Sequence, residues 1–394
     1  MGRRTAKATI RPDDELALAF VSQPCGEAGT FLAGHIAAEN ARQIIRRLLE
    51  QGGRYDNFLD AGIGELFHRW LLRADPGIEV CWHRAFSSVL SALRGDDEKA
   101  VIRAGVALAI HLNVTGEPGA WSAGGAGRQH EQWGAWLLPE YDRISVRTDG
   151  GEAILTLDGE LRLRFTRDGS QWRPDGIGLE ELHRVSIGGQ ATLLLPRAEV
   201  DGYPSGSRPA FLETIGSENA LRWRQTGLLI ESYAAEFAPW IGGVVRHVAL
   251  LDPSPGTVYS GSHSDRYGFI FGSDEASIPA SAEILVHEAS HQYFLILRRL
   301  GPLDDGSDTS LYYSPLVDRG RPLDRILFAF HACANILGFY RSCVAAGISD
   351  TSYFSKNEPV VVDQLRQLIL PLRTSRALTP TGRALFEPWA EIVH

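Results

Sequence analysis

The sequence feature that most constrains the fold is a long apolar segment, residues 284–297, that contains only a few polar side chains. Ser277, with Pro279 just after it, suits the start of a helix, and Gly301-Pro302 provides a stop after Leu300. Apolar residues lie on nearly every side of such a helix, and this pattern is typical of a helix buried in a protein core. The sequence therefore predicts a buried helix of about twenty residues at this point.

His287, Glu288 and His291 form a His-Glu-x-x-His pattern inside this predicted helix. Residues four apart on an α-helix share one face, so His287 and His291 can offer two imidazole nitrogens to a single cation. Glu288 projects about 100° further round the helix, where it can reach a metal-bound water or a substrate group. Buried imidazoles and carboxylates need partners, which are either a metal ion or hydrogen bonds within the core. We expect a metal centre on this helix.

The identity of a third ligand decides which chemistry such a centre can perform. No histidine follows within the next turns, and this excludes the metzincin class of peptidases. Glu358, the first glutamate after Glu288, precedes a proline, so a peptidase with a helix-borne glutamate ligand is disfavoured; Asp318 and Asp324 remain alternatives. We favour His331, because it lies in the apolar stretch 326–334, where an unpaired imidazole is costly. Three histidines suit both iron and hydrolytic zinc.

The periodicity of the remaining chain indicates an α+β fold, mostly helical, with a small antiparallel β region in the middle and a C-terminal helical metal-binding core. Apolar residues at helical spacing occupy much of residues 31–114, whereas residues 154–165 alternate and contain an Asp-Gly turn. We expect a helical N-terminal layer over residues 1–140, a β-rich segment over 141–210 and the catalytic region over 211–394. The glycine-rich run from Gly116 to Gly134 is interpreted as a loop.

The catalytic region should begin with a helix and two strands that precede the metal helix. The pattern predicts a helix over Ser217–Trp240, then strands around Arg246–Leu251 and Tyr267–Gly272. Three further helices are expected after the metal helix, over Leu323–Ala346, Glu358–Leu372 and Pro380–Ile392. Cys81 and His83 have no other ligand nearby in the sequence, so no metal site is expected there.

Charge and composition exclude several classes of function. The net charge of −9 and the pI near 5.8 argue against nucleic acid or an anionic membrane as the main partner. No apolar run of about twenty residues predicts a membrane span, and we place the protein in the cytoplasm. The sequence contains only three lysines and no P-loop motif, so Schiff-base and P-loop nucleotide chemistry have no support. Four cysteines are too sparse for a disulfide scaffold.

The segment from about Ser260 to Tyr340 resembles the 2-oxoglutarate-dependent HExxH-type peptide β-hydroxylases of ribosomal peptide biosynthesis. The residues that carry the resemblance are the Leu-Val-His-Glu-x-x-His core at 285–291, Ser262-His263-Ser264 with Tyr267-Gly268-Phe269-Ile270 before it, and Tyr313-Ser314-Pro315, Arg321-Pro322-Leu323 and His331 after it. The similarity covers about a fifth of the chain.

The resemblance implies a non-haem Fe(II) dioxygenase that uses 2-oxoglutarate as co-substrate. Such an enzyme hydroxylates an unactivated carbon, usually at a β position, of a peptide or an amino-acid-derived molecule in natural-product biosynthesis. Arg321 is our choice for the carboxylate of 2-oxoglutarate, because a guanidinium pairs with it bidentately, and Arg319 and Arg325 are nearby alternatives. Two other functions stay open: a zinc-dependent metallohydrolase or peptidase with Glu288 as general base, and a peptide-binding module that retains a metal for stability.

Overall fold

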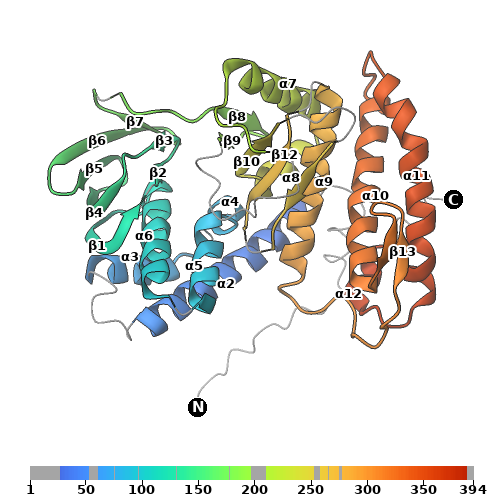
Figure 1. Cartoon of the computed structure of the whole chain (residues 1–394), viewed down its shortest axis with the longest axis horizontal. Helices are drawn as coiled ribbons and strands as arrows, with labels where there is room; N and C mark the ends of the chain where they lie inside the picture. Colours follow the sequence, from blue (N-terminus) through green and yellow to red (C-terminus); the bar gives the residue numbers. More distant parts are fainter. Residues whose placement is uncertain are drawn as a thin grey trace.

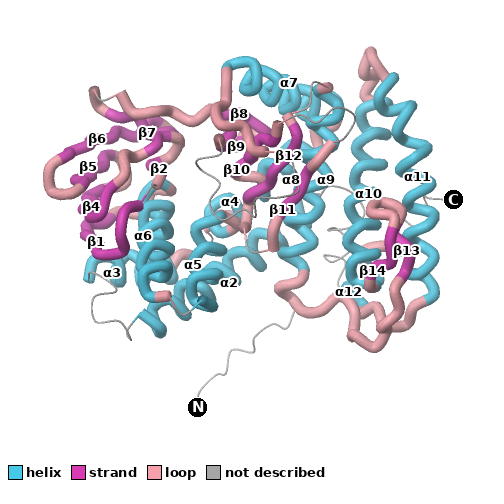
Figure 2. The backbone as a smooth tube through the Cα atoms, in the orientation of Figure 1, coloured by secondary structure: helices cyan, strands magenta, loops and turns pink. Residues whose placement is uncertain are grey.

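The computed structural model arranges the chain in three regions along its longest axis (Figure 1). N-terminal helices with one β-sheet lie at one end, a second sheet with the metal-motif helix lies in the middle, and a pair of long helices lies at the other end (Figure 2). The structure describes residues 27–52, 61–74, 76–95, 97–129, 131–176, 178–196, 210–252, 258–264, 266–274 and 277–387. The α+β class predicted from the sequence is confirmed.

The N-terminal region is helical up to Val114, as the periodicity predicts. Its helices are α2 (Glu27–Gly52), α3 (Ala61–Leu71), α4 (Ile78–Cys81), α5 (Arg84–Gly95) and α6 (Glu98–Val114). Asp97 caps α6, because its carboxylate accepts hydrogen bonds from the backbone N–H groups of Lys99 and Ala100. The helices bury aliphatic and aromatic side chains such as Trp70 and Phe86 and so close one side of the protein core.

The first sheet is antiparallel, with the strand order β1-β4-β5-β6-β7. Its strands are β1 (Gly119–Gln129), β4 (Tyr141–Thr148), β5 (Glu152–Leu157), β6 (Leu161–Asp168) and β7 (Gln171–Pro174). The alternating segment forms β5 and β6, which turn at residues 158–160 as predicted. A two-stranded ladder of β2 (Gln132–Trp133) and β3 (Trp136–Leu137) follows β1.

The interpretation of Gly116–Gly134 as a loop was wrong, because strand β1 runs through it and pairs with β4 over Gly119–Gly124. Glycine weakens an isolated strand, but here the small residues leave room for large neighbours. A Cβ atom at Gly124 would lie 2.8 Å from Cγ of Arg143 on β4. The first sheet therefore begins before residue 141, where the β-rich segment was expected to start.

The second sheet is mixed and forms the centre of the molecule, with the strand order β11-β12-β10-β9-β8. Its strands are β8 (Arg184–Ile187), β9 (Gln190–Leu195), β10 (His247–Leu251), β11 (Ser260–Ser262) and β12 (Phe269–Ser273). β10 runs parallel to both β9 and β12 and is buried along its whole length, as is β12. The two strands predicted around Arg246–Leu251 and Tyr267–Gly272 are thus confirmed.

Helices α7 (Ser217–Tyr233) and α8 (Phe237–Val244) replace the single helix predicted over Ser217–Trp240. Pro239 explains the break, since a proline inside a continuous helix would clash with the carbonyl four residues earlier. The chain leaves the helical conformation at Ala234, and Pro239 then falls in the first turn of α8, where a proline is tolerated.

The C-terminal region contains a short hairpin and long helices. Strands β13 (Tyr312–Ser314) and β14 (Arg319–Arg321) pair and lead directly into α10 (Leu323–Ala345), which is followed by α11 (Ser352–Thr374) and α12 (Pro380–Ala384). The last part of the helix predicted to reach Ile392 lies outside the described residues. Helix α10 is long and apolar enough to span a membrane, but 78% of its most apolar window is buried inside the protein, so it is a core helix.

Candidate metal centre

Helix α9 (Ile278–Leu297) carries the metal motif, and it forms where the sequence predicts it. Ser277 occupies the N-cap and Pro279 lies in the first turn. The helix packs between the second sheet and α10, and Gly272 on β12 makes the approach to the sheet close. A Cβ atom at Gly272 would lie 2.8 Å from Cγ2 of Ile284, so a larger residue there would push the motif helix away from the sheet.

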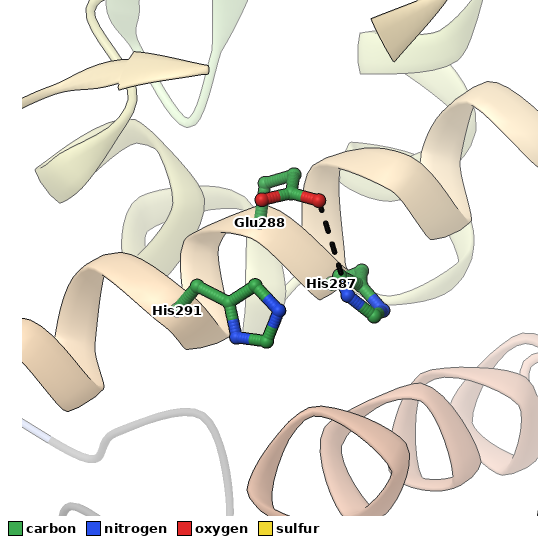
Figure 3. A group of neighbouring side chains, drawn as sticks. All are labelled: His287, Glu288 and His291. Carbon is green, nitrogen blue, oxygen red and sulfur yellow. Dashed lines mark ion pairs between the residues drawn. The ribbon is translucent and has the colours of Figure 1, made fainter. Parts of the chain in front are cut away.

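His287, Glu288 and His291 bring their donor atoms together on α9. One ligand atom from each lies within 4.8 Å of the other two. The two imidazole rings lie side by side on one side of the helix, with ring centroids 4.4 Å apart and an interplanar angle of 82° (Figure 3). This geometry is the one expected of a helical i, i+4 pair of metal ligands.

Glu288 is held by strand β11. Its side chain is 1% exposed, and its Oε1 accepts a hydrogen bond of 2.6 Å from the Ser260 hydroxyl. The same oxygen lies 3.8 Å from Nε2 of His287. Burial raises the pKa of Glu288 to about 7, while Ser260 and Ser262 oppose this rise by hydrogen bonding to the carboxylate. Glu288 can therefore accept or hold a proton beside the two imidazoles.

Both histidines of the motif are in the protonation state that metal binding needs. Burial lowers the pKa of His287 to about 4 and that of His291 well below its usual value, so both rings are neutral at pH 7. His291 stacks on Phe328 of α10 at a centroid distance of 3.7 Å, and its buried Nδ1 has no hydrogen-bond partner within the described part of the chain. The side chain of His287 is 24% exposed, so the centre is accessible from solvent at this residue.

His331, the predicted third ligand, lies on α10 and is fully buried. Its ring lies 6.1 Å from the ring of Phe294 on α9, and its charge contributes to the lowered pKa of His291. Asn335, one turn later on α10, places Nδ2 3.4 Å from Nε2 of His331. The group of donor atoms within 4.8 Å of one another does not include His331, so its role as a ligand stays a prediction.

Arg321, the predicted co-substrate residue, ends strand β14, immediately before α10. Burial lowers its pKa first, followed by the nearby charges of Arg325 and Arg319. The charges of Arg321 and Arg325 also lower the pKa of His291, so both guanidinium groups lie within electrostatic reach of the metal motif. Arg325 packs over the Phe328 ring at 5.7 Å, whereas Arg319 is exposed. The structure thus brings a positive charge to the site.

Sequence reasoning missed the residues that support the motif from a distance. Ser260 lies 28 residues before Glu288, in a three-residue polar strand without a motif of its own. Gln292 follows His291 and is completely buried. Its Oε1 accepts hydrogen bonds from Nε1 of Trp82 at 2.7 Å and from the N–H of Gly268 at 3.1 Å, and its Nε2 donates to the Phe269 carbonyl. A glutamine beside His291 within an apolar run is the signal that the sequence offers for this second network.

Comparisons with known proteins give no family assignment. No protein-family model matches the sequence, and no curated protein matches it. The function is therefore argued from the geometry of the metal motif and its surroundings.

Proposed function

We propose that this protein is an Fe(II)- and 2-oxoglutarate-dependent oxygenase that hydroxylates an unactivated carbon of a peptide or amino-acid-derived substrate in natural-product biosynthesis. The observation that carries the proposal is the combination of two neutral, convergent imidazoles with arginine charge within electrostatic reach of the same site. A hydrolytic zinc centre needs the first feature but not the second. A centre that also binds an anionic co-substrate needs both.

The donor set fits a divalent metal. His287 and His291 would hold it. The buried Nδ1 of His291 lacks a hydrogen-bond partner in the described structure, which is consistent with a metal ion bound beside this ring. His331 is our proposed third ligand. When bound, Fe(II) supplies the oxidative chemistry in which substrate, dioxygen and 2-oxoglutarate become hydroxylated substrate, succinate and carbon dioxide.

The chain's own residues bind and orient the other components. Arg321 would pair with the distal carboxylate of 2-oxoglutarate, since no ion pair occupies its guanidinium in the described structure. Phe328 packs flat against His291 and fixes the plane of that ring. Ser260 donates a hydrogen bond to Oε1 of Glu288 and so orients that carboxyl, which would serve as a proton acceptor beside the two imidazoles.

The decisive experiment is anaerobic reconstitution with Fe(II), followed by addition of 2-oxoglutarate and oxygen and measurement of succinate. Wild-type protein should release succinate, whereas His287→Ala should release none above background. His68→Ala, which changes an exposed histidine of α3, is the matched control and should behave as wild type. Succinate release by the His287→Ala variant equal to that of wild type would contradict the proposal.

The arginine assignment has its own test. Arg321→Gln should raise the KM for 2-oxoglutarate at least tenfold, because a charge-assisted bidentate pair is lost. Arg319→Gln changes an exposed arginine on the same short strand and should leave this KM unchanged. An equal effect of both substitutions would mean that the general positive charge, and not the guanidinium of Arg321, binds the co-substrate.

One observation favours a second candidate, a zinc-dependent hydrolase. Ser260 orients Glu288 so that Oε1 lies 3.8 Å from Nε2 of His287, a place from which a carboxylate could act as general base. Peptide cleavage that requires zinc, persists without oxygen and is lost in Glu288→Gln would favour this function. Under either proposal the partner is a peptide or small molecule and the location is the cytoplasm.

A further inference from the structure

A second polar centre lies away from the metal motif, in a cavity of about 1630 Å³. Its lining residues come from α5, α6 and α7, from β6 and β7 of the first sheet and from β8, β9 and β10 of the middle sheet. Of the described residues that line it, seven are arginines and three are acidic, which leaves four positive charges in excess. The whole chain has a net charge of −9, so this concentration of arginine is local.

Three histidines from distant parts of the sequence meet at the wall of this cavity. The rings of His83 and His111 stack with centroids 3.8 Å apart, and His247 meets His83 edge-on at 4.9 Å. His111 donates from Nε2 to the Val80 carbonyl at 2.9 Å, and Nδ1 of His83 accepts from the N–H of Ala85. Burial lowers the pKa of all three rings, so they are neutral at pH 7.

Arg246, next to His247, supplies a buried charge to the cavity wall. The residue is 8% exposed, and burial lowers its pKa only to about 10, so it is positive at pH 7. Its Nε and Nη2 atoms have no hydrogen-bond partner in the described structure. Both atoms are buried, so Arg246 acts on the cavity through its charge. Nδ1 of His247, which is 3% exposed, also has no partner there.

The charges of the side chains in this wall favour an anion over a cation as the bound ligand. Arg84 and Arg246 place positive charge beside the three imidazoles, and this opposes a metal ion. In addition, the one set of metal-type donors that converges within the described ranges is the motif on α9. The charge of Glu79 acts on Arg246, but Nε and Nη2 have no hydrogen-bond partner in the described structure, and a nearby oxoanion would lower the cost of burying this charge. Neither His287, Glu288, His291, His331 nor Arg321 lines the cavity.

The size of the cavity favours a peptide segment over a small anion as its ligand. Typical small-molecule sites occupy about 300–1,000 Å³, and this cavity is larger. Trp172 and Phe269 add aromatic surface to its wall, and Arg224 of α7 lies at its exposed rim. Guanidinium groups distributed over the lining match carboxylates distributed along a chain, whereas a single phosphate would engage only those that converge on one point.

We propose that this cavity binds an acidic peptide segment, whose carboxylates are attracted by the buried charge of Arg246 and pair with exposed arginines of the lining such as Arg224 at the rim. The proposal does not depend on the reaction at the metal motif. It places a peptide-binding surface where the N-terminal helices meet the middle sheet. This surface is separate from the metal centre.

The test is fluorescence anisotropy of fluorescein-labelled hexaglutamate with the full chain. Wild-type protein should bind hexaglutamate with an affinity that falls as salt rises, and it should not bind hexaglutamine. Arg246→Gln should weaken binding at least tenfold, and Arg224→Gln about threefold. Arg224 is exposed, so this variant tests the proposal even where Arg246→Gln fails to fold.

Two further variants serve as controls. Arg162→Gln removes an exposed arginine of β6 that does not line the cavity and should bind as wild type. His287→Ala should also bind hexaglutamate as wild type does. Failure of the oxygenase proposal would therefore not affect this proposal. The proposal is overturned by equal affinity of wild type and Arg224→Gln, by equal binding of hexaglutamine, or by displacement of the label with inorganic phosphate at matched ionic strength.

Discussion

Replacing Gln292 with leucine should destabilise the protein strongly, although leucine has nearly the same volume. The glutamine Oε1 is the acceptor for two buried donors, Nε1 of Trp82 and the N–H of Gly268. Leucine would leave both donors without an acceptor, and each unsatisfied buried group costs about 1–3 kcal/mol. We expect the free energy of unfolding to fall by about 4 kcal/mol in total. The melting temperature should drop by about 8 °C.

The assay is urea unfolding followed by far-ultraviolet circular dichroism on the metal-free protein. Gln43→Leu, an exposed position on α2, is the matched control and should change the free energy of unfolding by less than about 0.5 kcal/mol. Gln292→Glu keeps an acceptor oxygen for Trp82 and Gly268 and should lose less stability than the leucine variant if it is protonated. A fall of less than about 1 kcal/mol in the free energy of unfolding of Gln292→Leu would contradict this reasoning, because the two buried donors would then not need the glutamine as their acceptor.

Zinc at a hundredfold excess over its dissociation constant should stabilise the wild-type protein by about 2.7 kcal/mol, and His291→Ala should abolish the resulting rise in melting temperature. Ser260→Ala removes the 2.6 Å hydrogen bond to buried Glu288 and should cost about 1.5–3 kcal/mol in urea unfolding. The His111 ring has a pKa of about 4 in the folded chain and 6.5 when unfolded, because it is buried. Between these values the unfolded chain binds the extra proton, so stability is complete above pH 6.5 and falls by about 3 kcal/mol as the pH drops to 4. His111→Gln, which can still donate to the Val80 carbonyl, should flatten this pH dependence of the urea midpoint.

Each of these predictions has a clear contrary result. An equal zinc-induced shift in His291→Ala and wild type would place the metal elsewhere, and His68→Ala is the control for the loss of a histidine. For the hydroxyl of Ser260, the control is Ser355→Ala at an exposed position of α11, and equal stability of the two variants would contradict the argument. Identical pH profiles for His111→Gln and wild type would assign the acid sensitivity to other groups.

The sequence predicts the parts of this fold in which a local pattern agrees with the final packing. Helix α9 is an example, because the apolar run that surrounds His287 and His291 is both a helical pattern and the buried surface itself. The same is true of β10 and β12, whose continuous apolar residues match their burial on both faces. In these segments the local preference and the tertiary environment give the same structure.

Prediction fails where the deciding contact comes from a distant part of the chain. The glycine-rich residues of β1 become a strand only because β4 lies beside them. His83 looks isolated in the sequence, yet the fold stacks it on His111 and sets it against His247. Ser260 reaches Glu288 only after β11 joins the middle sheet. None of these pairings leaves a periodic signal in a single sequence.

The position of Arg321 has a consequence for which dicarboxylates the site could accept. This arginine directly precedes Pro322, the N-cap of α10, so its Cα position is tied to the beginning of a rigid helix. Helix α10 in turn packs along α9, and Phe328 of α10 lies flat on His291. The distance from the backbone of Arg321 to the two imidazoles is thus set by the contact between two helices. Under the proposed function, this fixed distance would favour diacids of one length, because a shorter or longer one could not reach both the metal and Arg321.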